Sequence, residues 1–269
     1  MGSKGIYTAL SGAMAQSSKL ETLANNIANS DTTSFKKDRQ VFNEYLSAYE
    51  KLPDVIQVPK VPASIESFYD MQGGDRSYVN ASGSYTDFKQ GALKPSGNLL
   101  DLGLEGKGFF EVLTPQGLRL TRNGSFTVDS VGRLTTKEGD LVLGEGAQDP
   151  AARAIQVGSH GNITVSYEGE IFSEGKRVAR LSLVAPAESE ALSKVGQSMY
   201  ALKPNYNQTL EPVEGLKIHQ GFLEGSNVNI VEEMTDMIAT TRAFESTQQA
   251  IKAFDQMDQK LMNDVPRTT

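Results

Sequence analysis

Glycine and proline are distributed unevenly along this chain of 269 residues, and this restricts its possible folds more than any single motif. Of the 25 glycines, 18 fall between residues 73 and 175, and none lies between 226 and 269. All 10 prolines lie outside residues 1–52 and 213–265. Glycine and proline weaken helix interiors by about 1 and 3 kcal/mol and favour turns. The distribution therefore predicts helical ends that flank a turn-rich middle.

An amphipathic helix is expected over residues 5–28. Apolar or small side chains recur there at alternating steps of three and four residues, which is the spacing of one helix face. The turn-forming residues Ser30 to Ser34 are expected to end this helix. The face consists of Ile6, Ala9, Ala13, Gln16, Leu20, Leu23 and Ile27, of which Gln16 is the only polar member.

A second helix is expected near the other end, where about 35 residues before Pro266 contain neither glycine nor proline. Ser226 and Asn227 are candidate caps, and several acidic residues after them would face the positive end of the helix dipole. Side chains of its packing face recur at steps of three and four residues: Met234, Met237, Ile238, Thr241, Phe244, Gln248, Ile251, Phe254 and Leu261.

Neither helix has an apolar face wide enough to form a domain alone. One solution is that the two helices pack on each other and then against copies of themselves, as in a coiled coil. The other is an intramolecular helix hairpin that covers the middle domain. The pattern alone favours neither.

The middle of the chain, from about residue 76 to 210, is expected to form an antiparallel β domain. Short apolar runs alternate with turn sequences there, and no long helical pattern separates them, which disfavours a parallel α/β sheet. The fold class is therefore α+β, and the proline-containing stretch 50–75 is expected to be a linker or extended arm. The candidate strands are 84–90, 100–104, 108–113, 119–121, 125–128, 134–136, 141–143, 155–157, 163–166, 170–172, 177–185 and 199–202.

Composition removes several classes of function. The formal net charge of −7 argues against a general nucleic-acid binder. The absence of cysteine excludes disulfides and thiolate metal sites, and two histidines leave little scope for histidine-based chemistry. No apolar run approaches the roughly 18 residues that span a bilayer, and the first residues lack the pattern of a secretory signal. We therefore expect no enzyme, no catalytic residues, no cofactor, no metal and no membrane-spanning segment.

The remaining chemical candidates are weak. Gly106-Lys107-Gly108 begins like a dinucleotide-binding motif, but no helix follows, so a turn that leads into a strand is expected. Glu168, Glu170 and Glu174 could supply a carboxylate pair, but alternating glutamates beside glycines are more typical of a solvated hairpin. The chain's histidines, His160 and His219, lie 59 residues apart without a further ligand nearby.

Two polar groups near the N-terminal helix have competing interpretations. The cluster Lys36-Lys37-Asp38-Arg39 could contact nucleic acid, but a solvated helix face is the expected role. Asn25, Asn26 and Asn29 are poor interior helix residues. They could mark a fraying last turn, but we favour amides that bridge to neighbouring helices and fix the register of a packed bundle.

Several segments resemble the flagellar rod, hook and hook-associated axial proteins, and the basal-body rod proteins among them. The stretch from Ala24 to Lys36 is similar to that family's N-terminal signature, although Ser34 stands where glycine is usual. Residues 223–229, 233–238 and 242–245 are similar to its C-terminal end. Between them, the segments 88–91, 97–102, 106–110 and 121–126 agree in the same order. The resemblance covers most of the chain.

The resemblance implies a structural subunit without an active site. It implies a coiled-coil-like D0 domain from residues 1–35 and 226–269, a connecting Dc region from 36–80 and 205–225, and a β-rich D1 domain from 81–204. Similar proteins leave the cytosol through the flagellar type III export apparatus without a cleaved signal peptide. They assemble helically with themselves and other rod proteins into the periplasmic drive shaft, which transmits torque for motility.

Within the family, the chain's start and residues 223–238 are most similar to proximal rod proteins, with distal rod proteins or other axial proteins as the alternative. A periplasmic β-rich enzyme or a binding module is a remote alternative. The resemblance and the helix pattern together imply an assembly interface that consists of Ile6, Leu10, Ala13, Leu20, Leu23, Asn25, Asn26, Ile27, Asn29, Met234, Met237, Ile238, Thr241, Phe244, Ile251, Phe254 and Leu261.

Overall fold

The computed structural model describes residues 2–47, 76–146, 149–158, 163–204, 210–213 and 215–264. The chain forms two compact units, and each contains segments that are distant in sequence. One unit consists of residues 1–25, 39–85 and 231–269 and is called the helical unit here. The other consists of residues 26–38 and 86–230 and is called the β unit. The expected α+β class, with a helix near each end and a β-rich middle, is confirmed.

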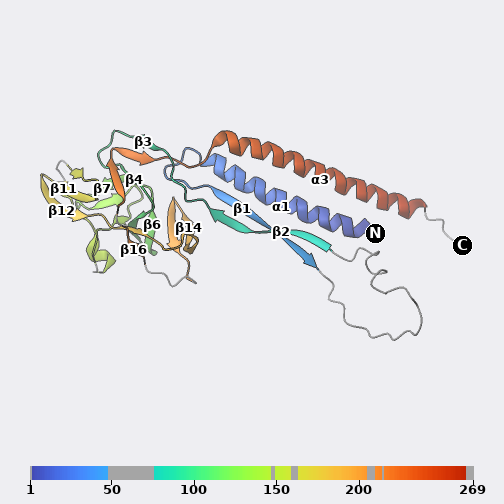
Figure 1. Cartoon of the computed structure of the whole chain (residues 1–269), viewed down its shortest axis with the longest axis horizontal. Coiled ribbons are helices and arrows are strands. Elements are labelled where there is room, and N and C mark those ends of the chain that lie inside the picture. Colours follow the sequence, from blue (N-terminus) through green and yellow to red (C-terminus); the bar gives the residue numbers. More distant parts are fainter. Residues whose placement is uncertain are drawn as a thin grey trace, which may run out of the picture. The chain divides into compact units, whose positions relative to one another are not determined.

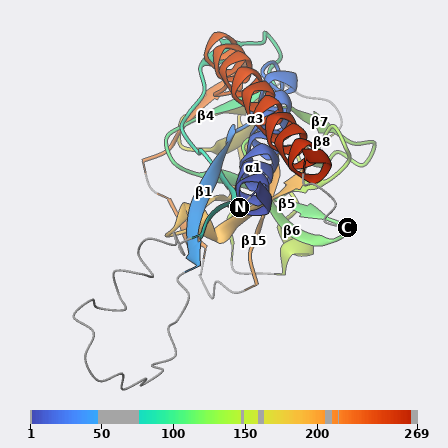
Figure 2. The ribbon, with the colours of Figure 1, turned by 90° about the vertical axis from the view of Figure 1, so that its right-hand side faces the viewer.

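The helical unit contains most of α1 (Gly2–Ala28), most of α3 (Ile230–Asp264) and the hairpin of β1 (Asp38–Ser47) with β2 (Arg76–Thr86). The two helices run in opposite directions, and α3 lies alongside α1 in both views (Figures 1 and 2). In Figure 1 the end of α1 and the start of α3 lie at the same end of this pair. Across the described residues, no helix is both long and apolar enough to cross a membrane.

The second helix begins later than the expected caps. Its first residue is Ile230, whereas Ser226 and Asn227 lie in the extended segment before it, so their expected capping role is wrong. The hydroxyl oxygen of Ser226 accepts a hydrogen bond from the Val228 amide within this segment. The side chain of Asn227 is bonded to the backbone of Lys37, Asp87 and Lys89 instead. These side chains are thus engaged before the helix starts.

The β unit is built around one large antiparallel sheet. Its strands follow the order β14-β15-β6-β5-β9-β8-β7, and β13 pairs with both β5 and β16. A three-stranded sheet, β10-β11-β12, and the pairs β17-β4 and β18-β3 complete the unit. The strands are β3 (Leu93–Pro95), β4 (Leu102–Glu105), β5 (Phe109–Thr114), β6 (Gly117–Thr121), β7 (Phe126–Val128), β8 (Leu134–Thr136), β9 (Leu141–Val142), β10 (Ile163–Val165), β11 (Glu170–Ser173), β12 (Lys176–Arg180), β13 (Leu183–Ala185), β14 (Leu192–Gly196), β15 (Met199–Leu202), β16 (Glu211–Pro212), β17 (Lys217–Gln220) and β18 (Phe222–Glu224).

Three of the expected strands differ in the structure. The candidate 84–90 ends at Thr86, because the backbone beyond it is bonded outside the strand pair. The Asp87 amide donates to the Lys37 carbonyl, and the Lys89 carbonyl accepts from the side chains of Lys36 and Asn227. Within residues 155–157, Gln156 forms one isolated bridge, to Arg133, and no strand is present. The candidate 177–185 is two strands, since the chain leaves β12 at Leu181 and Ser182 to bond elsewhere before β13 begins. The candidate arm 50–75 lies outside the described residues.

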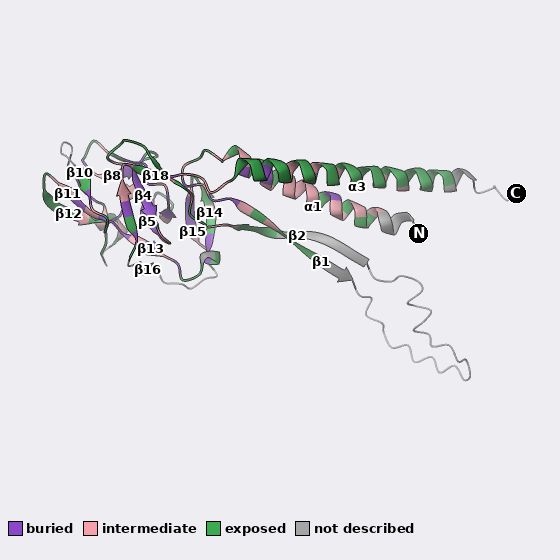
Figure 3. Ribbon diagram, turned by 45° about the horizontal axis from the view of Figure 1, so that its top comes forward, coloured by how far each residue is buried: buried purple, intermediate pink, exposed green. Residues whose placement is uncertain are grey.

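The core of the β unit consists of two apolar clusters, and the buried residues of Figure 3 concentrate there. The larger cluster includes Leu104, Phe110 and Ile171, which are fully buried. In the smaller cluster, the rings of Phe109 and Tyr200 lie 5.5 Å apart between centroids. Strand alternation places these side chains on inner faces, as the sheet geometry requires.

Alkaline pH should destabilise the β unit through Tyr200. Burial raises the pKa of this phenol above its ordinary value of 10.0, because the phenolate would lose its water. The unfolded chain therefore releases this proton first, and from about pH 10 upward stability should fall by up to about 1.4 kcal/mol per pH unit. We expect Tyr200→Phe to flatten this slope when unfolding free energies are compared between pH 8 and 11. An unchanged slope would contradict the assignment to Tyr200.

Candidate functional site: terminal helices and a buried charge cluster

The segments that resemble the axial-protein family meet at one place in the β unit. Here the chain enters from α1 through one segment and leaves toward α3 through another. We call these two segments the passages, and both are bonded to the β unit. We call this place the junction cluster and define it by five residues: Ser34, Lys36, Gly91, Arg122 and Glu224. Their positions in sequence are far apart, so only the fold brings them together.

Glu224, the last residue of β18, is the centre of the junction cluster. Its Oε1 atom lies 2.5 Å from the Lys36 Nζ atom and accepts a hydrogen bond from the Gly91 amide at 2.8 Å. Its Oε2 atom accepts from the Arg122 Nη1 atom at 3.0 Å. The side chains of Glu224 and Lys36 are both 0% exposed, and that of Arg122 is 3% exposed. One buried carboxylate thus faces two buried cations.

The cations are held by backbone oxygens as well. Lys36 Nζ also donates to the Lys89 carbonyl at 2.7 Å. Arg122 donates through Nε to the Gly108 carbonyl and through Nη2 to the Gly106 carbonyl. Burial lowers the pKa of the Lys36 ammonium from its ordinary value, and the nearby Glu224 carboxylate opposes that shift. Each charged group therefore has several partners, which a buried ion pair needs to offset lost hydration.

Ser34 allows the chain to turn into the junction cluster. Its φ is 57°, in the left-handed region that favours glycine. The serine hydroxyl donates to the Arg122 carbonyl at 2.7 Å, and the Ser34 amide donates to the Glu224 carbonyl at 2.8 Å. These two bonds hold the strained residue in place.

The backbone of Gly91 passes very close to the segment before α3. A Cβ atom at this position would fall well inside the contact distance of the Gly225 carbonyl oxygen and 3.2 Å from the Ser226 carbonyl carbon. Because those atoms belong to the backbone, they could not move aside without shifting the chain. Only glycine fits this crossing without such a shift.

The segment between α1 and β1 is fixed from two further sides. Lys194 on β14 donates from Nζ to the Lys36 carbonyl at 2.6 Å and to Asp38 Oδ2 at 2.7 Å. The amide side chain of Asn26 donates to the Asp38 carbonyl and accepts from the Asp38 amide. Lys36 and Lys37 are buried here, so the expected solvated helix face over residues 36–39 is wrong.

The three asparagines of the signature have different surroundings. Asn26 is buried, and the bonds described above connect it to its own chain at the start of β1. These bonds lie within one chain, so the expectation that the asparagine amides bridge to neighbouring helices of a packed bundle stays a prediction. Asn25 is exposed, and Asn29 is half-buried with its side-chain oxygen accepting from the Thr32 hydroxyl.

The expected interface residues of α1 fall into three groups by exposure. Side chains that are already buried within one chain can lose little more surface when copies assemble. Exposed side chains can lose much more. Ala13 and Leu23 are buried, Ile6, Leu20 and Ile27 are half-buried, and Leu10 is exposed.

The face of α3 that is least exposed follows strict steps of four and three residues. This is the repeat expected of a helix that packs along another helix. Among the expected interface residues, Met234 and Ile238 lie outside this face and are exposed, and the side chain of Leu261 lies outside the described residues. The face consists of Glu233, Met237, Thr240, Phe244, Thr247, Ile251 and Phe254, and Thr241 beside it is half-buried as well.

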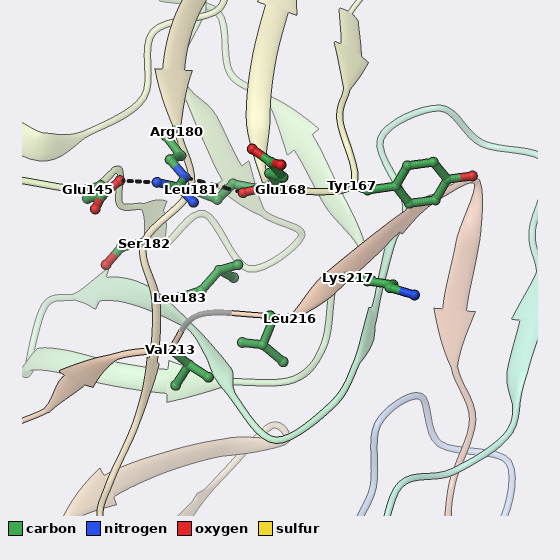
Figure 4. A pocket seen from close by; sticks show the side chains of 11 residues that line it. Glu145, Tyr167, Glu168, Arg180, Leu181, Ser182, Leu183, Val213, Leu216 and Lys217 are labelled. Carbon is green, nitrogen blue, oxygen red and sulfur yellow. Dashed lines mark hydrogen bonds and ion pairs between the residues drawn. The ribbon is translucent and has the colours of Figure 1, made fainter.

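A hollow of 660 Å³ in the β unit is the main alternative to a structural site (Figure 4). Its wall includes the apolar side chains of Leu181, Leu183 and Leu216. At one end, Arg180 Nη1 donates to Glu145 Oε2, and Arg180 Nε donates to the Glu168 carbonyl, both at 3.3 Å. The hollow therefore combines an apolar wall with an ion pair that is already formed.

The candidate catalytic and metal-binding side chains have structural roles in the described residues. Glu174 occupies the turn between β11 and β12, and Glu170 pairs with Arg177 at 3.1 Å, so the hairpin interpretation is confirmed. His219 Nε2 lies 2.7 Å from Glu105 Oε2, and this bond lowers the pKa of Glu105. No group of three metal-ligating side chains occurs among the described residues. His160 lies outside them.

Three family models match the chain. The model described as "Flagella basal body rod protein" matches residues 6–36, which cover most of α1 and the turn at Ser34. The "Flagellar hook protein FlgE/F/G D1 domain" matches residues 103–171 in the β unit. The "Flagellar basal body rod FlgEFG protein C-terminal" matches residues 219–264, which include Glu224 and α3.

Curated proteins are similar over nearly the whole chain. The flagellar basal-body rod protein FlgF of Rhizobium meliloti is 35% identical over 90% of this chain and 89% of its own length. FlgF of Caulobacter vibrioides is 34% identical with the same coverage. The flagellar basal-body rod protein FlgG of Bacillus subtilis is 31% identical over 97% of this chain and 98% of its own length.

Proposed function

This chain belongs to the flagellar basal-body rod protein family, and from that membership we propose that it is the proximal rod subunit, similar to FlgF. As a member of the family it is a structural subunit of the basal-body rod, and we infer that it carries no active site. The observation that carries this proposal is the 35% identity to FlgF over 90% of the chain. The distal rod protein FlgG is the second candidate, because its alignments span more of the chain.

The proposed arrangement has three parts that follow the family's organisation. Residues 1–35 and 226–269 form the D0 domain, residues 36–80 and 205–225 the connecting Dc region, and residues 81–204 the D1 domain. The heptad-like face of α3 supports coiled-coil-like packing of the terminal helices. In the rod, the expected interface residues would pack between subunits in a helical assembly and so transmit torque.

Export and location follow from the same membership. The subunit would leave the cytosol through the flagellar type III export apparatus, without a cleaved signal, and assemble with other rod proteins across the periplasm. Mixed exposure of the interface residues supports assembly, since Leu10, Met234 and Ile238 are apolar and exposed in the isolated chain.

Electron microscopy of basal bodies from an in-frame deletion strain tests the proposal, together with a swimming assay. We expect non-motile cells whose rods stop short near the inner membrane. Re-expression of the full chain should restore rod length and swimming. Longer rods that lack a hook would identify the distal subunit instead. Complete basal bodies and normal swimming would overturn the rod assignment.

A further inference from the structure

Two hollows in the β unit adjoin one exposed aromatic side chain. Tyr167, in the turn between β10 and β11, lines both the hollow of 660 Å³ and a second hollow of 310 Å³. It is 66% exposed. Both volumes lie within the range of about 300 to 1,000 Å³ that is typical of small-ligand sites. We call the two hollows, together with Tyr167, the Tyr167 site.

The smaller hollow presents a row of aromatic rings. The ring centroid of His219 lies 5.6 Å from that of Tyr167 and 6.0 Å from that of Phe222, and both contacts are edge-to-face. Phe222 is 36% exposed, so the row reaches the surface at both ends. Aromatic rings at a surface bind ligands that are apolar on one side and polar on another. Sugar rings have this character, because their faces carry C–H groups and their edges carry hydroxyls.

The larger hollow presents an aliphatic wall. Its members are Leu181, Leu183 and Leu216, and Tyr167 and Lys217 lie toward one end of it (Figure 4). Lys217 is exposed, so its ammonium group can reach a ligand from the rim. A wall of this kind accepts a small apolar group, and the donor at the rim can bond an oxygen next to that group.

The charges around the Tyr167 site are balanced. Two acidic and two basic side chains line the larger hollow, and Arg180 Nη1 already lies 3.3 Å from Glu145 Oε2. Beside the smaller hollow, His219 Nε2 lies 2.7 Å from Glu105 Oε2. Complementary charge is what attracts a strongly charged ligand, and the site has no excess of either sign. An uncharged polar ligand therefore fits better than an anionic or cationic one.

The strands that border the Tyr167 site have no open edge in the described part of the chain. β13 pairs with β5 on one side and with β16 on the other. β17 pairs with β4, and on its other side the Ile218 amide donates to the Tyr167 carbonyl at 3.0 Å. An extended peptide binds a sheet by adding hydrogen bonds along an open edge. Recognition here therefore has to come from rings, side chains and hollows, which disfavours a peptide strand.

We propose that the Tyr167 site binds an oligosaccharide of β-1,4-linked N-acetylated amino sugars. The C–H faces of the sugar rings stack on Tyr167 and on the aromatic row, and their hydroxyls remain in water. The methyl of one acetamido group contacts the leucine wall, and Lys217 donates to the carbonyl oxygen of the same group. Because the β-1,4 linkage keeps the chain extended, successive sugars reach both hollows, which meet at Tyr167. This binding role goes beyond the structural role of the subunit and does not depend on it.

Isothermal titration calorimetry of the purified full chain with N-acetylchitotetraose tests the proposal. We expect saturable binding that is about tenfold stronger than the binding of cellotetraose, which has the same linkage but no acetamido group. The difference arises because cellotetraose leaves the leucine wall and Lys217 without a partner group. No binding of N-acetylchitotetraose, or equal binding of the two sugars, would overturn the proposal.

Variants of Tyr167 place the ligand on the site. Tyr167→Ala should weaken the binding of N-acetylchitotetraose by about tenfold, whereas Tyr167→Phe keeps the ring and should bind within about twofold of the parent chain. The matched control is Tyr85→Ala, because Tyr85 is 48% exposed and lines neither hollow. Unchanged binding by Tyr167→Ala, or equal weakening by Tyr85→Ala, would overturn the assignment. The assay measures binding alone, so its failure would leave the rod assignment intact.

Discussion

Replacing Glu224 with alanine should lower the free energy of unfolding of the β unit by about 3 to 5 kcal/mol. The substitution removes the only carboxylate that the described contacts place between Lys36 and Arg122, and it leaves both cations buried. It also removes the acceptor of the Gly91 amide. Urea unfolding of the purified full chain, followed by tyrosine fluorescence because tryptophan is absent, measures the loss.

The matched control for Glu224 is Glu170, which also pairs with an arginine. Its partner Arg177 is 58% exposed, and the two atoms lie 3.1 Å apart at the surface. Glu170→Ala should cost about 1 kcal/mol or less, because water already screens this pair. Glu224→Gln keeps the shape of the side chain but not its charge. Its loss of unfolding free energy should lie between those of Glu170→Ala and Glu224→Ala. Equal losses for Glu224→Ala and Glu170→Ala would contradict the role of the buried cluster.

Replacing Gly91 with alanine should be destabilising by about 3 kcal/mol, because the added methyl group overpacks a backbone crossing. The new Cβ atom would collide with the carbonyl of Gly225, and the segment from Glu224 to Ser226 would have to move. That movement would also lengthen the bond from the Gly91 amide to Glu224. The measurement is the same urea titration. The slope of the unfolding free energy against urea concentration should be unchanged if unfolding remains two-state.

Gly225 provides the control for this crossing, because it lies on the facing segment. A Cβ atom there would lie 3.3 Å from the Ala92 carbonyl oxygen and 3.3 Å from the Lys94 Cε atom, and the lysine side chain can yield. Gly225→Ala should therefore cost less than about 1 kcal/mol. If Gly91→Ala and Gly225→Ala lowered the free energy of unfolding equally, the effect would come from the general flexibility of glycine. It would then not come from the close approach of the Gly91 backbone to Gly225.

The two helices and the β-rich middle could be predicted from local sequence signals. The distribution of glycine and proline, together with the steps of three and four residues, identified α1 to within three residues at its start. Many short strands were found because turn residues bound them. The start of α3 was harder to predict, since Ser226 and Asn227 are residue types that cap helices but are bonded elsewhere in the fold.

The junction cluster could not be predicted, because its members bond over distances of up to 190 residues in sequence. Lys36 sits in a basic run that is typical of a solvated surface, and nothing near it in sequence signals Glu224. The ten-residue strand β1 was missed for a similar reason, since it pairs with β2 across a long separation. The segments that resemble the axial-protein family contain all five residues of the junction cluster. The resemblance did not show that these residues contact one another.

The bonding pattern of the junction cluster has a mechanical consequence. The chain enters the β unit from α1 through Ser34 and Lys36 and leaves toward α3 through Glu224, and these passages are bonded to each other and to Arg122. The two passages are therefore tied to each other as well as to the sheet, so neither can leave the β unit while these bonds hold. Freeing either one requires the buried Lys36–Glu224 pair or the Ser34 bonds to break, and this makes the connection a single fastening for both ends of the chain.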